Sequence, residues 1–254
     1  MASNTVVLIT GVNRGIGNGL FKTYLSRPNH VVIGAVRDPS SPLSKALYDL
    51  PAASGSRAIV VKIDSASETD PFDAVKSLQA DHGITKLDLA IANAGILKGF
   101  PQVKEVRPAD LKEHFDVNVV GPVVLFQAVL PLLEAAVAGA VSPPKFISIG
   151  SSAGSIGGME LRPFPNAAYA PGKAALHYLT KKIHTEHPQL IALPIDPGWP
   201  RSEMGNMAAN HFGITEAEIT VDDSVAGIVK IIDNATREKT SGKLMVWDGS
   251  ECPW

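Results

Sequence analysis

Seven short runs of apolar, mostly β-branched residues recur along this sequence, each followed by turn residues and then by a stretch with helical spacing. The runs are TVVLITG, HVVIGAVRD, RAIVVKID, LDLAIANAG, KFISIGS, LIALPIDPG and KLMVWDG. Strands that are apolar along their whole length and joined by helices are typical of a parallel sheet buried on both faces. We therefore predict a single doubly wound α/β domain over residues 1–254 with a seven-stranded, mainly parallel sheet, and helices near 15–26, 66–82, 108–137, 166–186 and 221–235.

Composition narrows the functional classes. Hydrophobic residues make up 45% of the chain and charged residues 19%, with a formal net charge of −2. No basic patch interleaved with aromatic residues is present, which argues against a nucleic-acid partner. The only cysteine is Cys252, so no intramolecular disulfide can form. The sequence also has no basic leader and no apolar run near 18 residues, which predicts a cytoplasmic protein without a membrane partner.

The segment TGVNRGIG lies where the first strand should end and the first helix begin. Glycines at such a turn allow a tight bend and let a pyrophosphate approach the backbone N–H groups of the helix N-terminus. Glycine also occurs in such turns for steric reasons alone. The strand-turn-helix context favours a dinucleotide site, with expected cofactor contacts from Gly11, Asn13, Arg14, Gly15, Ile16 and Gly17.

The end of the second predicted strand is where dinucleotide-binding proteins read the adenosine ribose, often with an acidic side chain. Here Arg37 stands close to that place, followed by Asp38. Together with Arg14, Arg37 could flank a ribose 2′-phosphate, because guanidinium groups match phosphate geometry. Asp38 could instead accept from a free 2′-hydroxyl, although RDPS is also an ordinary turn sequence. The arginines favour NADP over NAD.

The segment YAPGK places Tyr169 and Lys173 four residues apart on a predicted helix, hence on the same face. An ammonium near a phenol stabilises the phenolate and lowers a pKa that starts near 10. Such a phenol can donate a proton to a carbonyl oxygen near neutral pH. A tyrosine and a lysine at this spacing are common on solvated helices. The spacing indicates a catalytic pair here only together with the glycine loop and the strand pattern.

The motifs together resemble the short-chain dehydrogenase/reductase superfamily over essentially the whole chain. TGVNRGIG, ANAG at 92–95, DVNVVGP, the GSSAG serines, YAPGK and DPGWPRSEMG occur in that family's order. The segments PGWPRSEMG and GKLMVWDGSECPW look most like a fungal ketoreductase branch that includes norsolorinic acid ketoreductase and related carbonyl reductases. The resemblance implies a Rossmann-type fold, a bound NADP(H) and a carbonyl substrate.

The resemblance also implies roles for individual residues. Tyr169 would be the general acid, and Lys173 would bind the nicotinamide ribose and lower the pKa of that phenol. Ser151 would hydrogen-bond the substrate carbonyl, with Ser152 or Ser148 as alternatives. Asn118 would hold a water that links Lys173 to solvent. The remaining cofactor contacts would come from Asn93 near the adenosine ribose, Asp64 at the adenine amino group, and Pro197, Gly198 and Ser202 at the nicotinamide.

Three departures from the family pattern stand out. Ser202 takes the place of a common threonine, and Gly172 takes the place of a common serine within YAPGK. The step from Ser151 to Tyr169 is 18 residues, longer than usual in the family. We interpret the extra length as an insertion that lines a pocket for a bulky substrate.

GSSAG also fits the G-x-S-x-G pattern of a hydrolase nucleophile elbow, with Ser152 in the middle and Asp196 and His211 available as partners. An elbow needs a helix directly after the serine. The sequence that follows, GSIGGMELRPFP, does not favour one, because glycine and proline disrupt helices. The sequence therefore argues against a serine hydrolase.

Two glycine- and proline-containing segments, 155–166 and 198–218, follow the carboxyl ends of predicted strands, where open α/β sheets bind ligands. Apolar side chains in such loops suit a substrate pocket with a movable lid, although ordinary surface loops also carry scattered apolar residues. The pocket interpretation is favoured. The candidate pocket residues are Ile156, Met159, Leu161, Phe164, Met204, Met207 and Phe212.

These observations predict an NADPH-dependent ketoreductase that acts on a bulky, aromatic or polyketide-like ketone. An NADP-binding regulator without turnover and a dehydratase or epimerase on the same fold remain alternatives. His184 and His187 stand three apart on a predicted helix but lack a third ligand, so no metal site is expected. By the family resemblance, helices 108–137 and 166–186 would build a homodimer or homotetramer.

Overall fold

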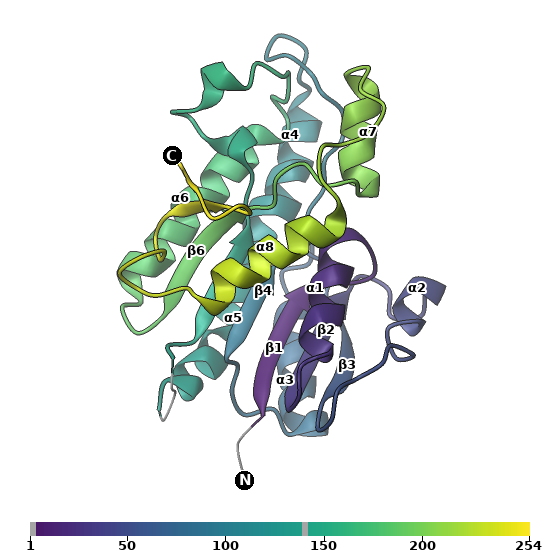
Figure 1. The fold of residues 1–254 in the computed structure, drawn as a ribbon, viewed down its shortest axis with the longest axis vertical. Helices are drawn as coiled ribbons and strands as arrows, with labels where there is room; N and C mark the ends of the chain where they lie inside the picture. The colour runs from purple at the N-terminus through teal and green to yellow at the C-terminus, as the bar shows by residue number, and fades with distance from the viewer. Residues whose placement is uncertain (1–3, 139–141) are drawn as a thin grey trace.

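The computed structural model describes residues 4–138 and 142–254, and the described residues contain one eight-stranded sheet in the order β3-β2-β1-β4-β5-β6-β7-β8 (Figure 1). All neighbouring strands pair in parallel except β7 and β8. The strands inside the sheet are almost entirely buried, as their apolar sequences require, whereas the edge strand β3 is partly exposed. The strands are β1 (Thr5–Thr10), β2 (His30–Val36), β3 (Arg57–Lys62), β4 (Leu89–Ala92), β5 (Lys145–Ile149), β6 (Ile191–Asp196), β7 (Leu244–Val246) and β8 (Glu251–Cys252).

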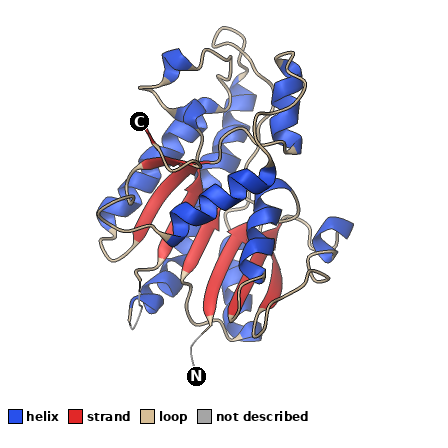
Figure 2. Ribbon diagram, viewed as in Figure 1, coloured by secondary structure: helices blue, strands red, loops and turns tan. Residues whose placement is uncertain are grey.

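Helices cover both faces of the sheet (Figure 2). One core cluster joins the sheet to α1 and α8 through residues such as Phe21 and Ile228. The other joins it to α3, α5 and α6 through residues such as Leu78, Val129 and Ile183. The helices are α1 (Gly15–Leu25), α2 (Pro42–Lys45), α3 (Asp70–His82), α4 (Pro108–Phe115), α5 (Gly121–Val137), α6 (Ala170–Glu186), α7 (Glu203–His211) and α8 (Val221–Asp233).

The strand order reverses between β1 and β4. From β1 the chain proceeds outward to β2 and β3, and from β4 it proceeds outward in the opposite direction to β5 and β6. The loops that leave the carboxyl ends of β1 and β4 therefore diverge and open a crevice, which is where ligands bind in open α/β sheets. The functional site is expected at this edge.

The predicted fold class is confirmed, and two details of the prediction are wrong. The sheet has an eighth strand, because Glu251–Cys252 pairs antiparallel with β7; two residues are too few to show a periodic pattern. The segment 198–218, predicted as a loop, contains α7, whose first turn is capped by the Ser202 hydroxyl accepting the N–H of Gly205. A capping serine favours a helix start even in a glycine-containing sequence.

The longest helical stretch, Pro108–Val137, is apolar enough to cross a membrane by length and composition, yet 61% of its most apolar window is buried inside the fold. It packs against the sheet as the core helix of a soluble protein does, with Leu125 and Leu133 fully enclosed. Between α4 and α5 the helix widens into a π-helical turn, Asp116–Val120. Such turns are uncommon and are often found at functional sites.

Candidate active site

A cavity of about 450 Å³ opens at the carboxyl edge of the sheet. Its volume lies in the range of small-molecule sites, roughly 300–1,000 Å³. Five segments of the chain that are separated in sequence supply its walls. The lining residues are Gly11, Asn13, Arg14, Gly15, Ile16, Gly17, Asn93, Ala94, Gly95, Ile96, Leu97, Lys98, Ile149, Gly150, Tyr169, Lys173, Pro197, Ser202, Glu203, Met204 and Met207.

The predicted glycine loop forms one wall of this cavity. Gly11 and Gly15 have φ values of 70° and 55°, in the left-handed region that favours glycine. A Cβ on Gly17 would lie 2.2 Å from the carbonyl oxygen of Gly11, so the turn closes only around glycine. Helix α1 begins at Gly15 and directs its first N–H groups toward the loop. This arrangement fits the pyrophosphate of a dinucleotide.

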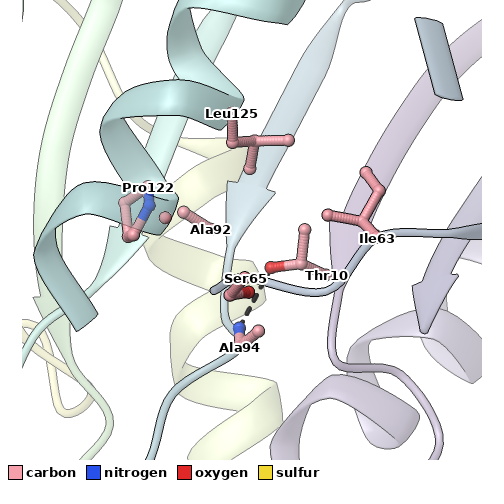
Figure 3. A pocket seen from close by; sticks show the side chains of 8 residues that line it. Thr10, Ile63, Ser65, Ala92, Ala94, Pro122 and Leu125 are labelled. Atoms are coloured by element: carbon pink, nitrogen blue, oxygen red, sulfur yellow. Dashed lines mark hydrogen bonds between the residues drawn. The ribbon is translucent and has the colours of Figure 1, made fainter. Parts of the chain in front are cut away.

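The segment after β4 is held to the glycine loop through Thr10 and Asn93. The Thr10 hydroxyl oxygen accepts the N–H groups of Asn93 and Ala94, each at 3.0 Å. The Asn93 side-chain amide donates to the carbonyl oxygens of Thr10, at 2.8 Å, and Gly11, at 3.2 Å. Figure 3 shows the Thr10–Ala94 contact, beside the small gap that Ser65 and Pro122 help to line. Asn93 lines the cavity and also fixes the shape of the loop.

At the end of β2, Arg37 is exposed and Asp38 is engaged in its own turn. The Asp38 carboxylate accepts both the N–H, at 2.8 Å, and the hydroxyl, at 2.6 Å, of Ser40. These bonds lower the pKa of Asp38. Arg14 pairs with Glu203 across the mouth of the cavity. Arg37 is therefore exposed to solvent, whereas Arg14 is engaged by Glu203 and the Asp38 carboxylate is engaged by Ser40.

Only some of the other residues expected to contact the cofactor line the cavity. Pro197 and Ser202 line the cavity, whereas Asp64 and Gly198 do not. The Asp64 carboxylate accepts the N–H of Ala66 at 3.0 Å, just beyond β3. Gly198 has a φ of 74°, and a Cβ there would lie 2.6 Å from Trp247. Gly198 therefore shapes the turn after β6, and the contact of Asp64 with an adenine remains a prediction.

Tyr169 and Lys173 come together at the inner end of the cavity, as predicted. Tyr169 precedes the first residue of α6, and Lys173 follows in its first turn. The ammonium of Lys173 lies 5.5 Å from the centroid of the Tyr169 ring and donates to the carbonyl oxygen of Ile149 at 2.7 Å. This carbonyl ends β5, so the lysine is fixed to the sheet edge. Burial lowers the pKa of Lys173 to about 8, an effect that Asp196 opposes.

The pKa of Tyr169 differs from the expectation based on spacing. Burial raises the pKa of the phenol above its usual value, Ser151 lowers it through a hydrogen bond, and Asp196 raises it. The predicted lowering by Lys173 is absent from these influences. The spacing on a helix indicates which side chains are close, but it does not indicate how much water the fold removes. The phenol is therefore protonated at neutral pH, which is the form a proton donor requires.

Asn118 lies in the π-helical turn and is buried. Its side-chain oxygen accepts the N–H of Ile96 at 2.8 Å, and its side-chain amide donates to the carbonyl oxygen of Ile96 at 2.9 Å. A Cβ on Gly95 would lie 3.0 Å from the Asn118 oxygen and 3.9 Å from the Lys173 nitrogen. Glycine at 95 thus keeps the space between these two side chains open. The predicted water there is untested.

The three candidate serines have different surroundings. The Ser148 hydroxyl is buried and bonds that of Thr180 at 2.8 Å, away from the cavity. The hydroxyl of Ser151 lies close enough to Tyr169 to lower the pKa of the phenol. Ser152 begins a three-residue 3-10 turn, Ser152–Gly154, and no longer helix follows directly. The geometry brings Ser151 to the phenol and lacks the helix of a nucleophile elbow.

The expected substrate pocket is only partly assembled around the cavity. Met204 and Met207 of α7 line it, whereas Ile156, Met159, Leu161, Phe164 and Phe212 do not. Ile156, Met159 and Leu161 are 71%, 59% and 82% exposed. Phe164 instead packs on Phe212 with ring centroids 4.8 Å apart. The insertion between Ser151 and Tyr169 therefore does not line the cavity, because the structure describes no long helix or strand in its glycine- and proline-containing chain that could bury these side chains.

Sequence reasoning missed the wall that follows β4. Ile96, Leu97 and Lys98 line the cavity directly after the ANAG motif. His114 of α4 holds this segment: its ring accepts the N–H of Lys98 at 3.0 Å, and its other nitrogen lies 2.7 Å from the carbonyl oxygen of Asp110. The position of ANAG at a strand end was the available signal. Within 4–138 and 142–254, no group of three or more His, Cys, Asp or Glu could hold a metal ion.

Comparison with known proteins agrees with this site. The chain is 42% identical to norsolorinic acid ketoreductase nor1 of Dothistroma septosporum, over 100% of this chain and 94% of that protein. It is 41% identical to the short-chain dehydrogenase srdF of Neurospora crassa, over 100% of this chain and 99% of that protein. The structure of an NADPH-bound carbonyl reductase from chicken fatty liver superposes with a TM-score of 0.87 at 28% identity, covering 100% of both chains.

A second solved structure, carbonyl reductase Sniffer of D. melanogaster, superposes with a TM-score of 0.84 at 28% identity, again over 100% of both chains. The family model for short chain dehydrogenases matches residues 5–210, a range that contains the glycine loop, Asn118, Ser151, Tyr169 and Lys173. The chain is an oxidoreductase with a site suited to an NAD(P) cofactor, and it belongs to the short-chain dehydrogenase/reductase family.

Proposed function

We propose that this protein is a ketoreductase that uses NADPH to reduce a bulky, aromatic or polyketide-like ketone to a secondary alcohol. One observation carries the proposal: a proton-donating phenol, a buried lysine and the glycine loop line the same cavity. Within it, Tyr169 and Lys173 stand opposite a loop shaped for a dinucleotide. A dinucleotide and a proton donor in one cavity are what carbonyl reduction requires.

The residues of this chain would divide the work as follows. Gly11–Gly17, Asn93 and Pro197 would hold NADPH, which would supply the hydride for the carbonyl carbon. Ser151 donates a hydrogen bond to the carbonyl oxygen, where negative charge develops. Tyr169, whose phenol is protonated at neutral pH, gives that oxygen its proton. Lys173, with a pKa of about 8, can hold or release a proton near neutral pH and so resupply the phenol, with Asn118 beside it.

The preference for NADPH is supported by the surroundings of β2. Arg37 and Arg14 present guanidinium groups, which match a 2′-phosphate. Asp38 is the residue that would favour NADH, but its Oδ1 atom already accepts hydrogen bonds from the N–H and the hydroxyl of Ser40. The NADPH-bound carbonyl reductase is consistent with this preference.

The substrate class is supported by aromatic rings, several of which lie on segments that continue from the residues lining the cavity. Phe100 packs against His211 and Phe212 with centroids 4.5 and 5.0 Å apart, and Phe164 packs against Phe212 and Trp199. These rings join the segment after β4, the insertion and α7 into an aromatic rim. Such a rim suits a planar, apolar substrate. Relatives named norsolorinic acid ketoreductases are consistent with a polyketide ketone.

The test is an assay at 340 nm with NADPH or NADH and ketones from small aliphatic to polycyclic aryl compounds, followed by product analysis. We expect NADPH to be consumed faster than NADH, larger aryl ketones to be preferred, and the product to be the secondary alcohol. Tight NADPH binding without turnover would favour the NADP-binding regulator. A dehydrated or epimerised product would favour the alternative enzyme classes.

We also infer that the chain works as a single catalytic domain in the cytoplasm, as a homodimer or homotetramer. Exposed apolar side chains on the helices expected to form the interface support an oligomer, namely Phe115 of α4, Val120 of the π-helical turn and Tyr178 of α6. Sedimentation at micromolar concentration should show a dimer or tetramer. A monomer alone would contradict the assembly.

A further inference from the structure

A buried histidine that the proposed reaction does not use lies directly beneath the serine that would bind the carbonyl. His177 is on α6, one turn beyond Lys173, and is 2% exposed. Its Nε2 atom accepts the backbone N–H of Ser151 at 3.2 Å. The histidine therefore contacts the serine through the main chain and not through the serine hydroxyl.

The protonation state of His177 follows from this contact. An Nε2 atom that accepts a hydrogen bond must carry its proton on Nδ1 in the neutral ring. Burial, and secondarily Lys173, lowers the pKa of His177 to about 3, so the ring is neutral at all working pH values. Nδ1 is buried and has no hydrogen-bond partner among the described residues. An unpaired buried donor is unfavourable, so stability alone does not account for a histidine here.

The backbone around Ser151 fits closely against this part of α6. A Cβ on Gly150 would lie 2.7 Å from Nε2 of His177. A Cβ on Gly154 would lie 2.6 Å from the backbone nitrogen of Ala174. Neither glycine has a positive φ, so close approach, not backbone conformation, requires them. The two glycines let the chain on either side of Ser151 rest on the helix that carries Lys173 and His177.

The C-terminal segment, residues 253 and 254, places the Trp254 ring beside the imidazole of His177. The ring of Trp254 lies 6.3 Å from that of His177, at an interplanar angle of 61°. The Nζ atom of Lys181 lies 4.6 Å from the Trp254 ring centroid. A cation over an aromatic face is a favourable contact. The Trp254 ring therefore contacts two side chains of α6, His177 and Lys181.

The same segment also binds the start of the insertion. The Ser155 hydroxyl donates to the carbonyl oxygen of Pro253 and accepts the N–H of Gly158 at 3.0 Å. The N–H of Gly157 donates to the carbonyl oxygen of Trp254 at 2.6 Å. The Ser155–Pro253 and Gly157–Trp254 hydrogen bonds fasten the segment 155–158, which begins four residues after Ser151, to the C-terminal segment.

We propose that His177 and Trp254 are positioning residues that fix Ser151 for the carbonyl: His177 holds the Ser151 backbone, and Trp254 covers His177 while its segment holds residues 155–158. The inference deepens the proposed ketoreductase and rests on it for the role of Ser151. The Ser151 hydroxyl oxygen already accepts the N–H of Ala153 at 3.2 Å. Its own hydrogen faces the Tyr169 phenol, whose pKa it lowers, and the direction of that donor depends on the backbone that His177 holds.

The first test compares His177→Gln with His177→Met. Both replacements have similar reach, but only glutamine offers an oxygen acceptor for the Ser151 N–H. We expect His177→Met to lower kcat about tenfold to a hundredfold, since small displacements of a reacting geometry are costly. The KM for NADPH should stay within about twofold, and His177→Gln should restore most of kcat. A merely structural role would not produce rescue by the residue that keeps the acceptor.

The matched control is His184→Met, on the same helix two turns further on. The Nδ1 atom of His184 lies 2.8 Å from the hydroxyl oxygen of Ser241, far along the chain from the catalytic serine. This variant should keep kcat and KM. Trp254→Ala should lower kcat in the same direction as His177→Met but by a smaller factor, whereas Trp254→Phe should retain most of it.

A readout that needs no turnover is backbone amide exchange, followed by mass spectrometry on peptides that cover 150–158. Exchange should rise in His177→Met and Trp254→Ala and stay at the wild-type level in His177→Gln and His184→Met. An unchanged kcat and unchanged exchange in His177→Met would overturn the inference while leaving the reductase intact. Absence of ketone reduction by the wild type would instead overturn the proposed function, and the positioning role would fall with it.

Discussion

The two sides of the cavity are built differently, although both lie at the same edge of one sheet. On the cofactor side, backbone contacts and close approach set the shape: Gly17 rests on the Gly11 carbonyl, and Asn93 bonds the loop from the next strand. On the substrate side, the side chains of Met204 and Met207 line the cavity, whereas the aromatic rim lies outside its lining, and many of these side chains are partly exposed.

This difference indicates what each side can tolerate. A wall fixed by backbone groups has one arrangement, because moving it breaks hydrogen bonds that have no substitute. A wall of flexible methionines and exposed rings can repack around differently shaped ligands at small cost. One fold can therefore keep a fixed dinucleotide site beside a substrate site that changes. The candidate active-site residues Tyr169, Lys173 and Ser151 lie at the boundary between the two sides.

The largest effect is expected at that boundary. Tyr169→Phe removes the proton donor and should lower kcat about a thousandfold, within the range that general acids supply. NADPH binding, measured by fluorescence titration, should change little, because the ring and its packing remain. A variant that keeps more than a tenth of wild-type kcat would show that another group donates the proton.

The next effect concerns the pH dependence of stability. The pKa of Lys173 falls from 10.5 to about 8 on folding, so between these values the unfolded chain binds more protons and wild-type stability rises with pH. Lys173→Met lacks this titration. The free energy of unfolding of the variant minus that of the wild type should fall by about 3 kcal/mol from pH 8 to pH 10.5.

Urea denaturation at several pH values measures this difference. Activity should be lost in Lys173→Met at every pH. A difference between variant and wild type that does not depend on pH would mean that the lysine is not strained by burial, and the boundary between the two sides would then be less closed to water than its contacts indicate.

Arg37→Ala tests the cofactor side at its exposed end. Loss of a charge-assisted contact to a 2′-phosphate should raise the KM for NADPH about tenfold to a hundredfold. The KM for NADH should stay within about twofold. Arg57→Ala, which removes another exposed arginine, at the start of β3, is the control and should change neither. An equal rise for both cofactors would contradict discrimination at the 2′ position.

The smallest effect is expected on the substrate side. Met207→Ala enlarges the cavity and removes an apolar contact from its wall. The KM for a bulky aryl ketone should therefore rise about fivefold to tenfold, with little change for a small ketone. Met159→Ala is the matched control, since Met159 is exposed and does not line the cavity. Equal effects of the two variants would indicate that the rim closes onto the substrate and that both methionines contact it.

Most of the fold and most of the cofactor side of the cavity could be predicted from the sequence. Continuous apolar strands, glycines at a strand-helix turn and a four-residue Tyr–Lys spacing are local patterns with few structural interpretations. The eighth strand escaped notice because Glu251–Cys252 is too short to be periodic. Helix α7 was missed because its glycine and preceding proline outweighed a capping serine. The exposure of Ile156 and Met159 could not be predicted, because an apolar residue in a loop has no periodic face.

The sequence by itself determined the doubly wound sheet, the glycine loop and the pairing of Tyr169 with Lys173, because these depend on neighbours a few residues apart. Only the tertiary structure decided the raised pKa of Tyr169, which depends on how much water the whole fold excludes. The tertiary structure also decided the contacts of His177 with Ser151 and of Trp254 with the insertion. Those contacts join segments distant in sequence, and only the packing of α6 and the final strand on one sheet brings them together.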